Sequence, residues 1–191
     1  MGSFNNRSIL YLHGYDSSSQ GSKPQLLRQL YPHNRLLIPD LPLDPLKCMN
    51  LSEDALRKAS NDTIIIGASL GGFYAYYLAA KFKKDCLLIN PVYQPAMEAK
   101  KMLDMEDNLE KKKVILNAAN MYLNYASNLN NLKHPVNCFV ALGNQDSIID
   151  PQKSSLHFAD ALIKTYHDDH YMLKSFPAVM KDFEAFLEET F

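Results

Sequence analysis

The sequence predicts an α/β fold built on a doubly wound, mostly parallel sheet of about six strands, and two observations lead to it. Short apolar runs alternate along the chain with segments of helical periodicity, which is the order of a sheet covered by helices on both faces. The apolar runs are nearly continuous, as expected for parallel strands that are buried on both sides. The length of 191 residues fits one domain spanning 1–191.

Six segments have the length and composition of strands. In chain order they are Ser8–Leu12, Arg35–Ile38, Thr63–Ile66, Cys86–Ile89, Val136–Leu142 and Ala161–Tyr166. Helical patterns lie between and after them, at Lys23–Tyr31, Ser52–Ser60, Leu70–Phe82, Pro151–Ala159 and about Ser175–Glu189. Ser22 with Gln25 predicts a capping box for the first helix. An apolar stripe on the last one is formed by Val179, Phe183, Phe186 and Leu187.

The stretch Gln94–Leu132 interrupts this rhythm. It is rich in Met, Asn, Lys and Leu and contains no strand pattern. We expect two or three short helices here, inserted after the fourth strand as a cap over the sheet edge. The basic run Lys111–Lys113 is expected to be a solvated helix face, since no aromatic residues interleave with it.

The composition excludes several classes of protein. The chain has 20 Lys and Arg against 21 Asp and Glu, whereas a general binder of nucleic acid or acidic membranes needs a basic surplus. A hydrophobic content of 47% rules out a disordered chain. The three cysteines, Cys48, Cys86 and Cys138, form neither a disulfide framework nor a zinc ligand set. With no apolar signal region at the N-terminus, a cytoplasmic location is expected.

The uncharged segment Thr63–Ala80 has the minimum length of a membrane-helix candidate. Its centre is Gly-Ala-Ser-Leu-Gly-Gly, which is a poor helix core. A short strand, a Gly/Ser turn and then a helix explain the segment better, so no membrane span is predicted.

This turn carries the main chemical signal. Only seven glycines occur in the chain, and five follow predicted strands or open a helix: Gly14, Gly67, Gly71, Gly72 and Gly143. The segment 67–71 matches G-x-S-x-G between a strand and a helix, the context of a nucleophile elbow. In so sharp a turn, side chains at Gly67 and Gly71 would clash, and the hydroxyl of Ser69 would project over the sheet edge. The alternative is a phosphate-binding turn or a plain connecting loop.

A nucleophilic serine of this kind is followed in the chain by a carboxylate and then a histidine. Asp146 is the favoured acid, because it lies in the loop just after the strand Val136–Leu142. Asp150 competes with it, but its position before Pro151 is typical of a helix N-cap.

Three histidines follow the acid. His157 lies in a helical pattern and is expected to be structural. His167 and His170 flank two aspartates after the last strand, and spacing favours His170 as the base while leaving His167 open. The His-Asp-Asp-His cluster also suggests a metal site as a minor alternative, but no further ligand set is visible, so neither a metal nor a cofactor is predicted.

Two backbone N–H groups are expected to form an oxyanion hole. One is the N–H of Leu70, directly after the serine. The other is the N–H of Tyr15 in the loop after the first strand, where Gly14 lets the backbone turn inward. We expect His13 to be structural, in the floor of the site.

Five segments together carry a family resemblance: 11–18 (YLHGYDSS), 67–75 (GASLGGFYA), 89–91 (INP), 143–146 and 169–171. They resemble the small single-domain α/β-hydrolases of the YqiA/YcfP-like (UPF0227-type) esterase family, over nearly the whole chain. The resemblance implies carboxylesterase or acyl thioesterase activity on modest acyl chains, with Ser69, Asp146 and His170 as the catalytic triad. The segment 94–132 departs from the smallest members by its length, so substrate preference does not carry over.

The predicted reaction is two-step acyl transfer from a small-molecule ester or thioester to water. An apolar acyl pocket under the inserted helices is one interpretation of Met97, Met102, Met105, Leu109, Met121, Tyr122 and Tyr125; ordinary packing is the other. Two further hypotheses remain: an inactive α/β-hydrolase-fold binding protein, and a hydrolase of another acyl bond, such as a peptide or lactone. The oligomeric state is not indicated.

Overall fold

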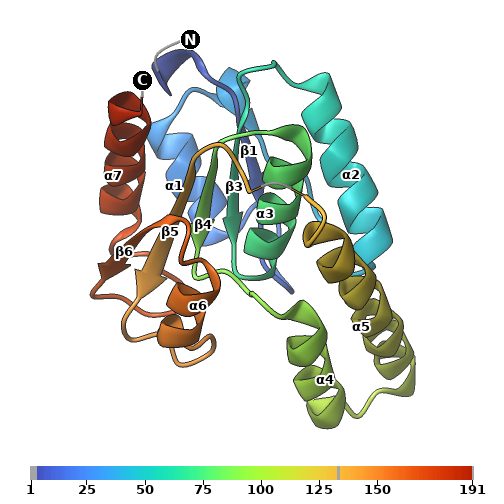
Figure 1. Ribbon diagram of the computed structural model, residues 1–191. Coiled ribbons are helices and arrows are strands. Elements are labelled where there is room, and N and C mark those ends of the chain that lie inside the picture. The colour runs from blue at the N-terminus through green and yellow to red at the C-terminus, as the bar shows by residue number, and fades with distance from the viewer. Residues whose placement is uncertain (1–3, 133, 191) are drawn as a thin grey trace.

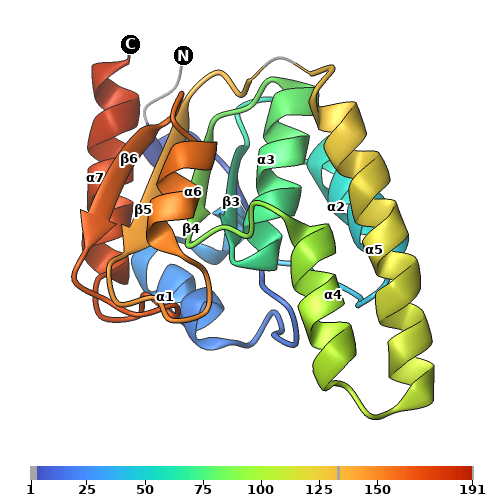
Figure 2. The same cartoon turned by 60° about the horizontal axis from the view of Figure 1, so that its bottom comes forward.

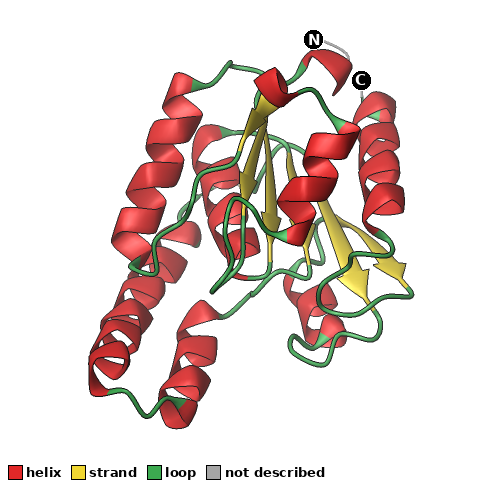
Figure 3. Ribbon diagram, turned by 180° about the vertical axis from the view of Figure 1, so that it is seen from behind, coloured by secondary structure: helices red, strands yellow, loops and turns green. Residues whose placement is uncertain are grey.

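The computed structural model describes residues 4–132 and 134–190, and the predicted parallel sheet is confirmed. All six strands pair in parallel, in the order β2-β1-β3-β4-β5-β6. Their bounds are β1 Ile9–Leu12, β2 Leu36–Leu37, β3 Ile64–Ala68, β4 Cys86–Ile89, β5 Cys138–Gly143 and β6 Leu162–Tyr166. Their carboxyl ends therefore meet at one edge (Figure 3). The strand order reverses between β1 and β3, which is where open α/β sheets bind ligands.

Helices cover both faces of the sheet (Figure 1). On one face lie α1 (Ser22–Leu30) and α7 (Phe176–Glu189), and on the other lie α2 (Pro45–Lys58), α3 (Leu70–Phe82) and α6 (Pro151–His157). Successive side chains of each strand enter opposite cores because strand side chains alternate. In β1, for example, Ile9 and Tyr11 pack with α1 and α7, while Leu10 and Leu12 pack with α2 and α3.

The predicted insertion after β4 is a pair of helices, α4 (Pro95–Met105) and α5 (Leu109–Leu129), of which α5 is long rather than short. Figure 2 shows the pair extending past the edge of the sheet. The buried side chains of α5 are Ile115, Ala118 and Tyr122, which join the core next to α2 and α3. Lys111 and Lys113 are exposed, as expected for a solvated face.

Two local predictions at helix starts are wrong. The capping box fails because Ser22 is already the first helical residue; Gly21 occupies the N-cap and supplies no side-chain bond. The second helix begins at Pro45 instead of Ser52, since the Asp44 carboxylate caps it by accepting a hydrogen bond from the Lys47 N–H. The segment Thr63–Ala80 forms β3, the turn and most of α3. Within the described residues, no helix has the length and apolar character needed to cross a membrane.

Candidate active site

The turn after β3 holds Ser69 in an unusual backbone conformation, with φ 54° and ψ −122°. Such a conformation is costly for a residue with a side chain and persists only where its surroundings enforce it. The neighbouring backbone supplies that enforcement. A Cβ on Gly67 would overlap the carbonyl oxygen of Gly71, and one on Gly71 would overlap that of Leu12. Glycine is therefore required at both positions by close packing, as the motif predicts.

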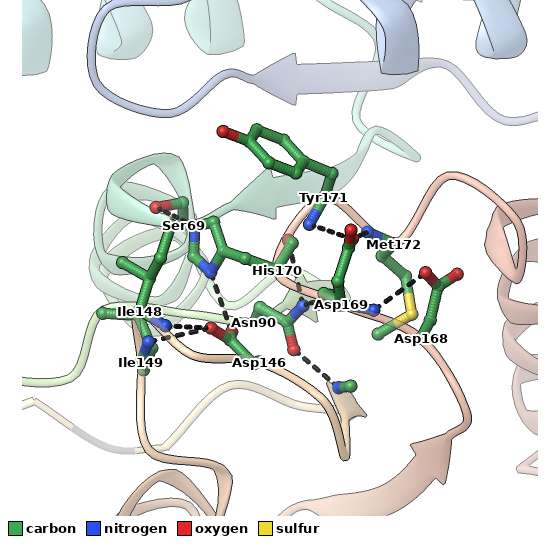
Figure 4. Close-up of polar contacts among 11 residues, drawn as sticks. Ser69, Asn90, Asp146, Ile148, Ile149, Asp168, Asp169, His170, Tyr171 and Met172 are labelled. Atoms are coloured by element: carbon green, nitrogen blue, oxygen red, sulfur yellow. Dashed lines mark hydrogen bonds and ion pairs between the residues drawn. The ribbon is translucent and has the colours of Figure 1, made fainter.

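Ser69, His170 and Asp146 form a continuous hydrogen-bonded chain (Figure 4). The Ser69 Oγ lies 3.0 Å from His170 Nε2, and His170 Nδ1 lies 2.7 Å from Asp146 Oδ2. The three residues follow β3, β6 and β5 respectively, so the parallel topology brings them to one edge from positions up to 101 residues apart.

The surroundings of Asp146 fix the direction of these bonds. Its Oδ1 accepts hydrogen bonds from the backbone N–H groups of Ile148, at 2.8 Å, and Ile149, at 2.9 Å. The side chain is only 1% exposed. A carboxylate held by donors in this way acts as an acceptor, so the proton of a neutral His170 ring lies on Nδ1. Nε2 is then free to accept from the Ser69 hydroxyl.

The competing residues lie elsewhere. Asp150 caps α6, accepting from the N–H groups of Gln152 and Lys153. The side chain of His167 is exposed and outside the cavity that Ser69 lines. His157 packs against the rings of Tyr93 and Phe158, and burial lowers its pKa.

The carboxylates of the His-Asp-Asp-His cluster are occupied by their own loop. Asp168 accepts from the N–H groups of Asp169 and Ser175, and Asp169 accepts from those of Tyr171 and Met172. Within residues 4–132 and 134–190, no group of three or more His, Cys, Asp or Glu side chains is arranged to hold a metal ion.

The loop after β1 passes directly over the serine. A Cβ on Gly14 would lie 3.1 Å from the Ser69 Cβ and 3.3 Å from the Ala68 carbonyl oxygen. Glycine is needed here for this close approach, and its φ is not positive. In the described part of the chain, the N–H groups of Tyr15 and Leu70 have no hydrogen-bond acceptor, and both residues line the cavity beside Ser69.

His13 anchors this loop, as a structural residue. It is buried, and its two ring nitrogens lie 2.8 Å from the Gly14 carbonyl oxygen and 2.9 Å from the Leu41 N–H nitrogen. The carbonyl requires a donor and the N–H an acceptor, so His13 is neutral with its proton on Nδ1.

A cavity of about 790 Å³ opens from Ser69 toward the inserted helices. Its far wall is largely apolar and comes from α4, α5 and the segment before them: Val92, Pro95, Ala99, Val114, Ile115, Ala118 and Tyr122. Of the residues proposed for an acyl pocket whose side chains the structure describes, Tyr122 alone lines it. The interpretation is wrong for Met97 and Leu109, which are 56% and 73% exposed, and for Met121 and Tyr125. The side chains of Met102 and Met105 lie outside the described residues.

Lys23, in the first turn of α1, lines the opposite, polar side of the cavity and was not identified from the sequence. Burial lowers the pKa of its ammonium to about 8, although Asp169, Asp168 and Asp146 act in the opposite direction. Among the described residues it has no ion pair within 4 Å. Its half-buried position depends on how the α1 start meets the β6–α7 loop, so no local pattern identifies it.

Other solved structures share the fold of this chain. The chain is similar to one solved structure described under the words "LipS and LipT, two metagenome-derived lipolytic enzymes": the TM-score is 0.73, the sequence identity is 14%, and the match covers 99% of this chain and 95% of that chain. It is similar to mouse alpha/beta hydrolase domain-containing protein 10, with a TM-score of 0.67 and a sequence identity of 14%, and the match covers 97% of this chain and 91% of that chain. It is also similar to S-formylglutathione hydrolase from Staphylococcus aureus. The TM-score is 0.63, the sequence identity is 17%, and the match covers 93% of this chain and 81% of that chain.

At such low identities these likenesses establish the fold, which is that of the α/β-hydrolases. A family model described as "Uncharacterised protein family (UPF0227)" matches residues 8–188, which include every strand and all the site residues described above. The chain therefore belongs to the UPF0227 family, with an α/β-hydrolase fold.

Proposed function

We propose that this protein is a serine hydrolase that cleaves a carboxylic ester or an acyl thioester. The observation that carries the proposal is the hydrogen-bonded chain from Ser69 Oγ through His170 to the buried Asp146. A serine hydroxyl becomes a useful nucleophile when a neighbouring base removes its proton during attack, and an oriented carboxylate keeps that base in the right tautomer.

In the first step, the Ser69 oxygen attacks the acyl carbon while His170 Nε2 takes the hydroxyl proton. Asp146 stabilises the imidazolium that forms, through the bond to Nδ1. The negative charge moves to the carbonyl oxygen, where the Tyr15 and Leu70 N–H groups are its proposed donors. Collapse of this intermediate breaks the bond to the alcohol or thiol, which receives the proton from His170, and leaves an acyl-Ser69 ester.

In the second step, His170 removes a proton from water as the water oxygen attacks the acyl-enzyme. Collapse then returns the proton to Ser69 and releases the carboxylic acid. Neither step draws on a metal or cofactor. The apolar wall formed by α4 and α5 suits a hydrocarbon acyl group, whose transfer from water contributes about 0.8 kcal/mol per buried CH₂.

Hydrolysis kinetics with a p-nitrophenyl ester and an acyl thioester test this proposal. Ser69→Ala should lower kcat by a factor on the order of 10⁶, and Asp146→Asn by about 10⁴, because the latter stabilises the wrong tautomer of His170. His167→Ala is the matched control, since this histidine is exposed and outside the cavity, and it should retain wild-type rates. Full activity in folded Ser69→Ala protein would remove this serine from the mechanism.

A further inference from the structure

Asn90, the residue directly after β4, is a buried polar side chain that the proposed mechanism does not use. It is 1% exposed and adopts a positive φ of 42°. Among residues with a side chain, asparagine and aspartate tolerate this left-handed conformation best. Both the backbone and the side chain of this position are therefore constrained.

All the hydrogen-bonding groups of the Asn90 amide are directed at the loops that carry the site (Figure 4). Its Nδ2 donates to the carbonyl oxygens of Asp169 and His170, each at 3.0 Å. Its Oδ1 accepts from the N–H of Gly143 at 2.7 Å. Gly143 ends β5 and leads into the turn that carries Asp146. One side chain thus joins the His170 loop to the Asp146 loop.

The backbone on either side of Asn90 bonds to Ser69, so the segment around Asn90 connects to the serine as well as to the His170 and Asp146 loops. The Ile89 carbonyl accepts from the Ser69 N–H, and the Val92 N–H donates to the Ser69 carbonyl, both at 3.0 Å. The N–H of Asn90 itself donates to Ala141 in β5 at 2.9 Å. The short segment 89–92 therefore bonds to the main chain of Ser69, of His170 and of Gly143, which lies three residues before Asp146.

We infer that Asn90 is a positioning residue, which holds the His170 imidazole at the correct place between Ser69 and Asp146. His170 belongs to a loop rather than to a helix or strand, so its ring position depends on where its backbone is fixed. The two Nδ2 bonds fix the carbonyl groups of the peptides before and after the His170 Cα. The Oδ1 bond ties this point to the loop that supplies the acid. The inference rests on the proposed function.

An amide is the side chain that these three bonds require. Aspartate has nearly the same shape and tolerates the same backbone, but its ionised carboxylate only accepts hydrogen bonds. Asn90→Asp therefore keeps the acceptor for Gly143 and removes both donors to the His170 loop. A displacement of about 1 Å in a catalytic group can lower a rate about 10²-fold.

The test measures Asn90→Asp beside a control that also removes a buried side-chain hydrogen bond, away from the site. Thr63→Val is that control, since Thr63 is buried, makes a side-chain bond to Ser60, and precedes β3 at the end remote from Ser69. We expect Asn90→Asp to lower kcat for a p-nitrophenyl ester about 10²-fold with little change in KM, and Thr63→Val to keep wild-type kcat. If Asn90→Asp and Thr63→Val lower the melting temperature equally and also lower kcat equally, the inference is overturned.

Proton NMR supplies a readout that does not depend on turnover. A His170 Nδ1–H that donates to Asp146 gives a far-downfield resonance, assigned by its loss in His170→Ala. We expect this resonance in wild type and in Thr63→Val, and its shift or loss in Asn90→Asp. An unchanged resonance with unchanged kcat would overturn the positioning role.

The same measurements separate this inference from the proposed function. Full activity in Ser69→Ala contradicts the proposed function whatever Asn90 does, whereas wild-type behaviour of Asn90→Asp contradicts only the positioning role. If Asn90→Asp fails to fold, Asn90→Gly serves in its place, because glycine accepts the positive φ and removes both donor bonds together with the acceptor for Gly143. The same outcomes then apply to it.

Discussion

Backbone groups, more than other side chains, hold the individual residues of this site. Ser69 is held by the enforced turn between Gly67 and Gly71, and its own N–H and carbonyl bond to the segment after β4. Asp146 is held by two N–H groups of its own turn. Because the main chain of a parallel sheet is rigid, such support orients side chains with little loss of freedom when substrate binds.

Gly14→Ala tests the proposed oxyanion donor on the β1 loop. Its added Cβ would meet the Ser69 Cβ at 3.1 Å and the Ala68 carbonyl oxygen at 3.3 Å, so the loop and the serine turn would separate by a few tenths of an ångström and change the position of the Tyr15 N–H relative to Ser69. Loss of one such donor lowers kcat by about 10²-fold or more. Steady-state kinetics with a melting curve checks this. A folded variant with wild-type kcat would show that the Tyr15 N–H does not bind the oxyanion.

Lys23→Met tests the cost of burying an ammonium beside the site. Burial lowers the pKa of Lys23 to about 8 in the folded protein, against 10.5 for a lysine in the unfolded chain, so between these values the unfolded chain binds more protons and wild-type stability rises with pH. Below pH 8 the folded state carries the full burial penalty. In addition, a cation in the first turn of α1 opposes the helix dipole.

We therefore expect Lys23→Met to melt at a higher temperature than wild type at pH 7, and this advantage to shrink between pH 8 and 10.5. Melting curves of both proteins over pH 6.5–10.5 measure the difference, in which shared titrations cancel. A difference that stays constant with pH, or a less stable variant at pH 7, would contradict the burial of Lys23.

The sequence predicts some residues of the site better than others, for a physical reason. Ser69, Asp146 and His170 each follow a strand, so chain order and the parallel sheet suffice to bring them to one edge. Asn90 and Lys23 have no such pattern. Asn90 bonds to residues 79 and 80 positions later, and that contact depends on how three loops pack.

Among the secondary-structure elements, α5 has the largest influence on the shape of the cavity. One stripe of the helix, containing Val114, Ile115, Ala118 and Tyr122, faces the cavity. Met121, although it belongs to the same helix, does not line the cavity. The composition indicated that this region is apolar. Which of its residues face the cavity depends on how α5 packs against α2 and α3.

Ala118→Leu tests the cavity as an acyl site. The larger side chain would fill space beside Ile115 and Tyr122 and shorten the room for a hydrocarbon chain. We expect kcat/KM to fall roughly 10-fold or more for long-chain esters, since the variant adds three carbon atoms and a mismatch of even one methylene in an apolar pocket costs about that much, and to change little for an acetyl ester. Rates across a series of p-nitrophenyl esters check this.

Asn117→Leu is the matched control, because Asn117 is exposed on the same helix and outside the cavity. It should leave the chain-length profile unchanged. Parallel profiles for Ala118→Leu and wild type would show that acyl chains do not bind along α5.

Helix starts were predicted less well than strands because they depend on single capping interactions. The first half of α2, Pro45–Leu51, has no strong apolar periodicity, and its start is set by the Asp44 side chain and by Pro45 at the first helical position. The central strands β1, β3 and β4 were easier to locate, since burial on both faces makes them continuously apolar.

At the scale of the whole molecule, two apolar cores share a single sheet. One contains α1 and α7, with Phe139, Phe176 and Phe183 fully buried, and the other contains α2, α3 and α5. Since each strand contributes to both cores, loss of one core removes support from the other. This arrangement favours cooperative unfolding of the chain as one domain, including the inserted helices, whose α5 side chains belong to the second core.

Single-tryptophan variants measure this cooperativity, because the chain has no tryptophan. Tyr125→Trp reports on α5, where Tyr125 contacts Tyr77 of α3, and Phe186→Trp reports on α7, where Phe186 contacts Phe139. We expect the urea midpoint from fluorescence to equal that from far-UV circular dichroism within each variant. An earlier fluorescence transition in Tyr125→Trp alone would show that the inserted helices unfold separately.

The central claim is that Ser69 is an activated nucleophile, and intact mass after treatment with a fluorophosphonate tests it most directly. The reagent reacts with serines that a neighbouring base activates. Wild type should gain the mass of one adduct, Ser69→Ala should gain none, and His167→Ala should behave as wild type. Absence of an adduct on well-folded wild-type protein would contradict the claim and favour a binding protein that has this fold without the chemistry.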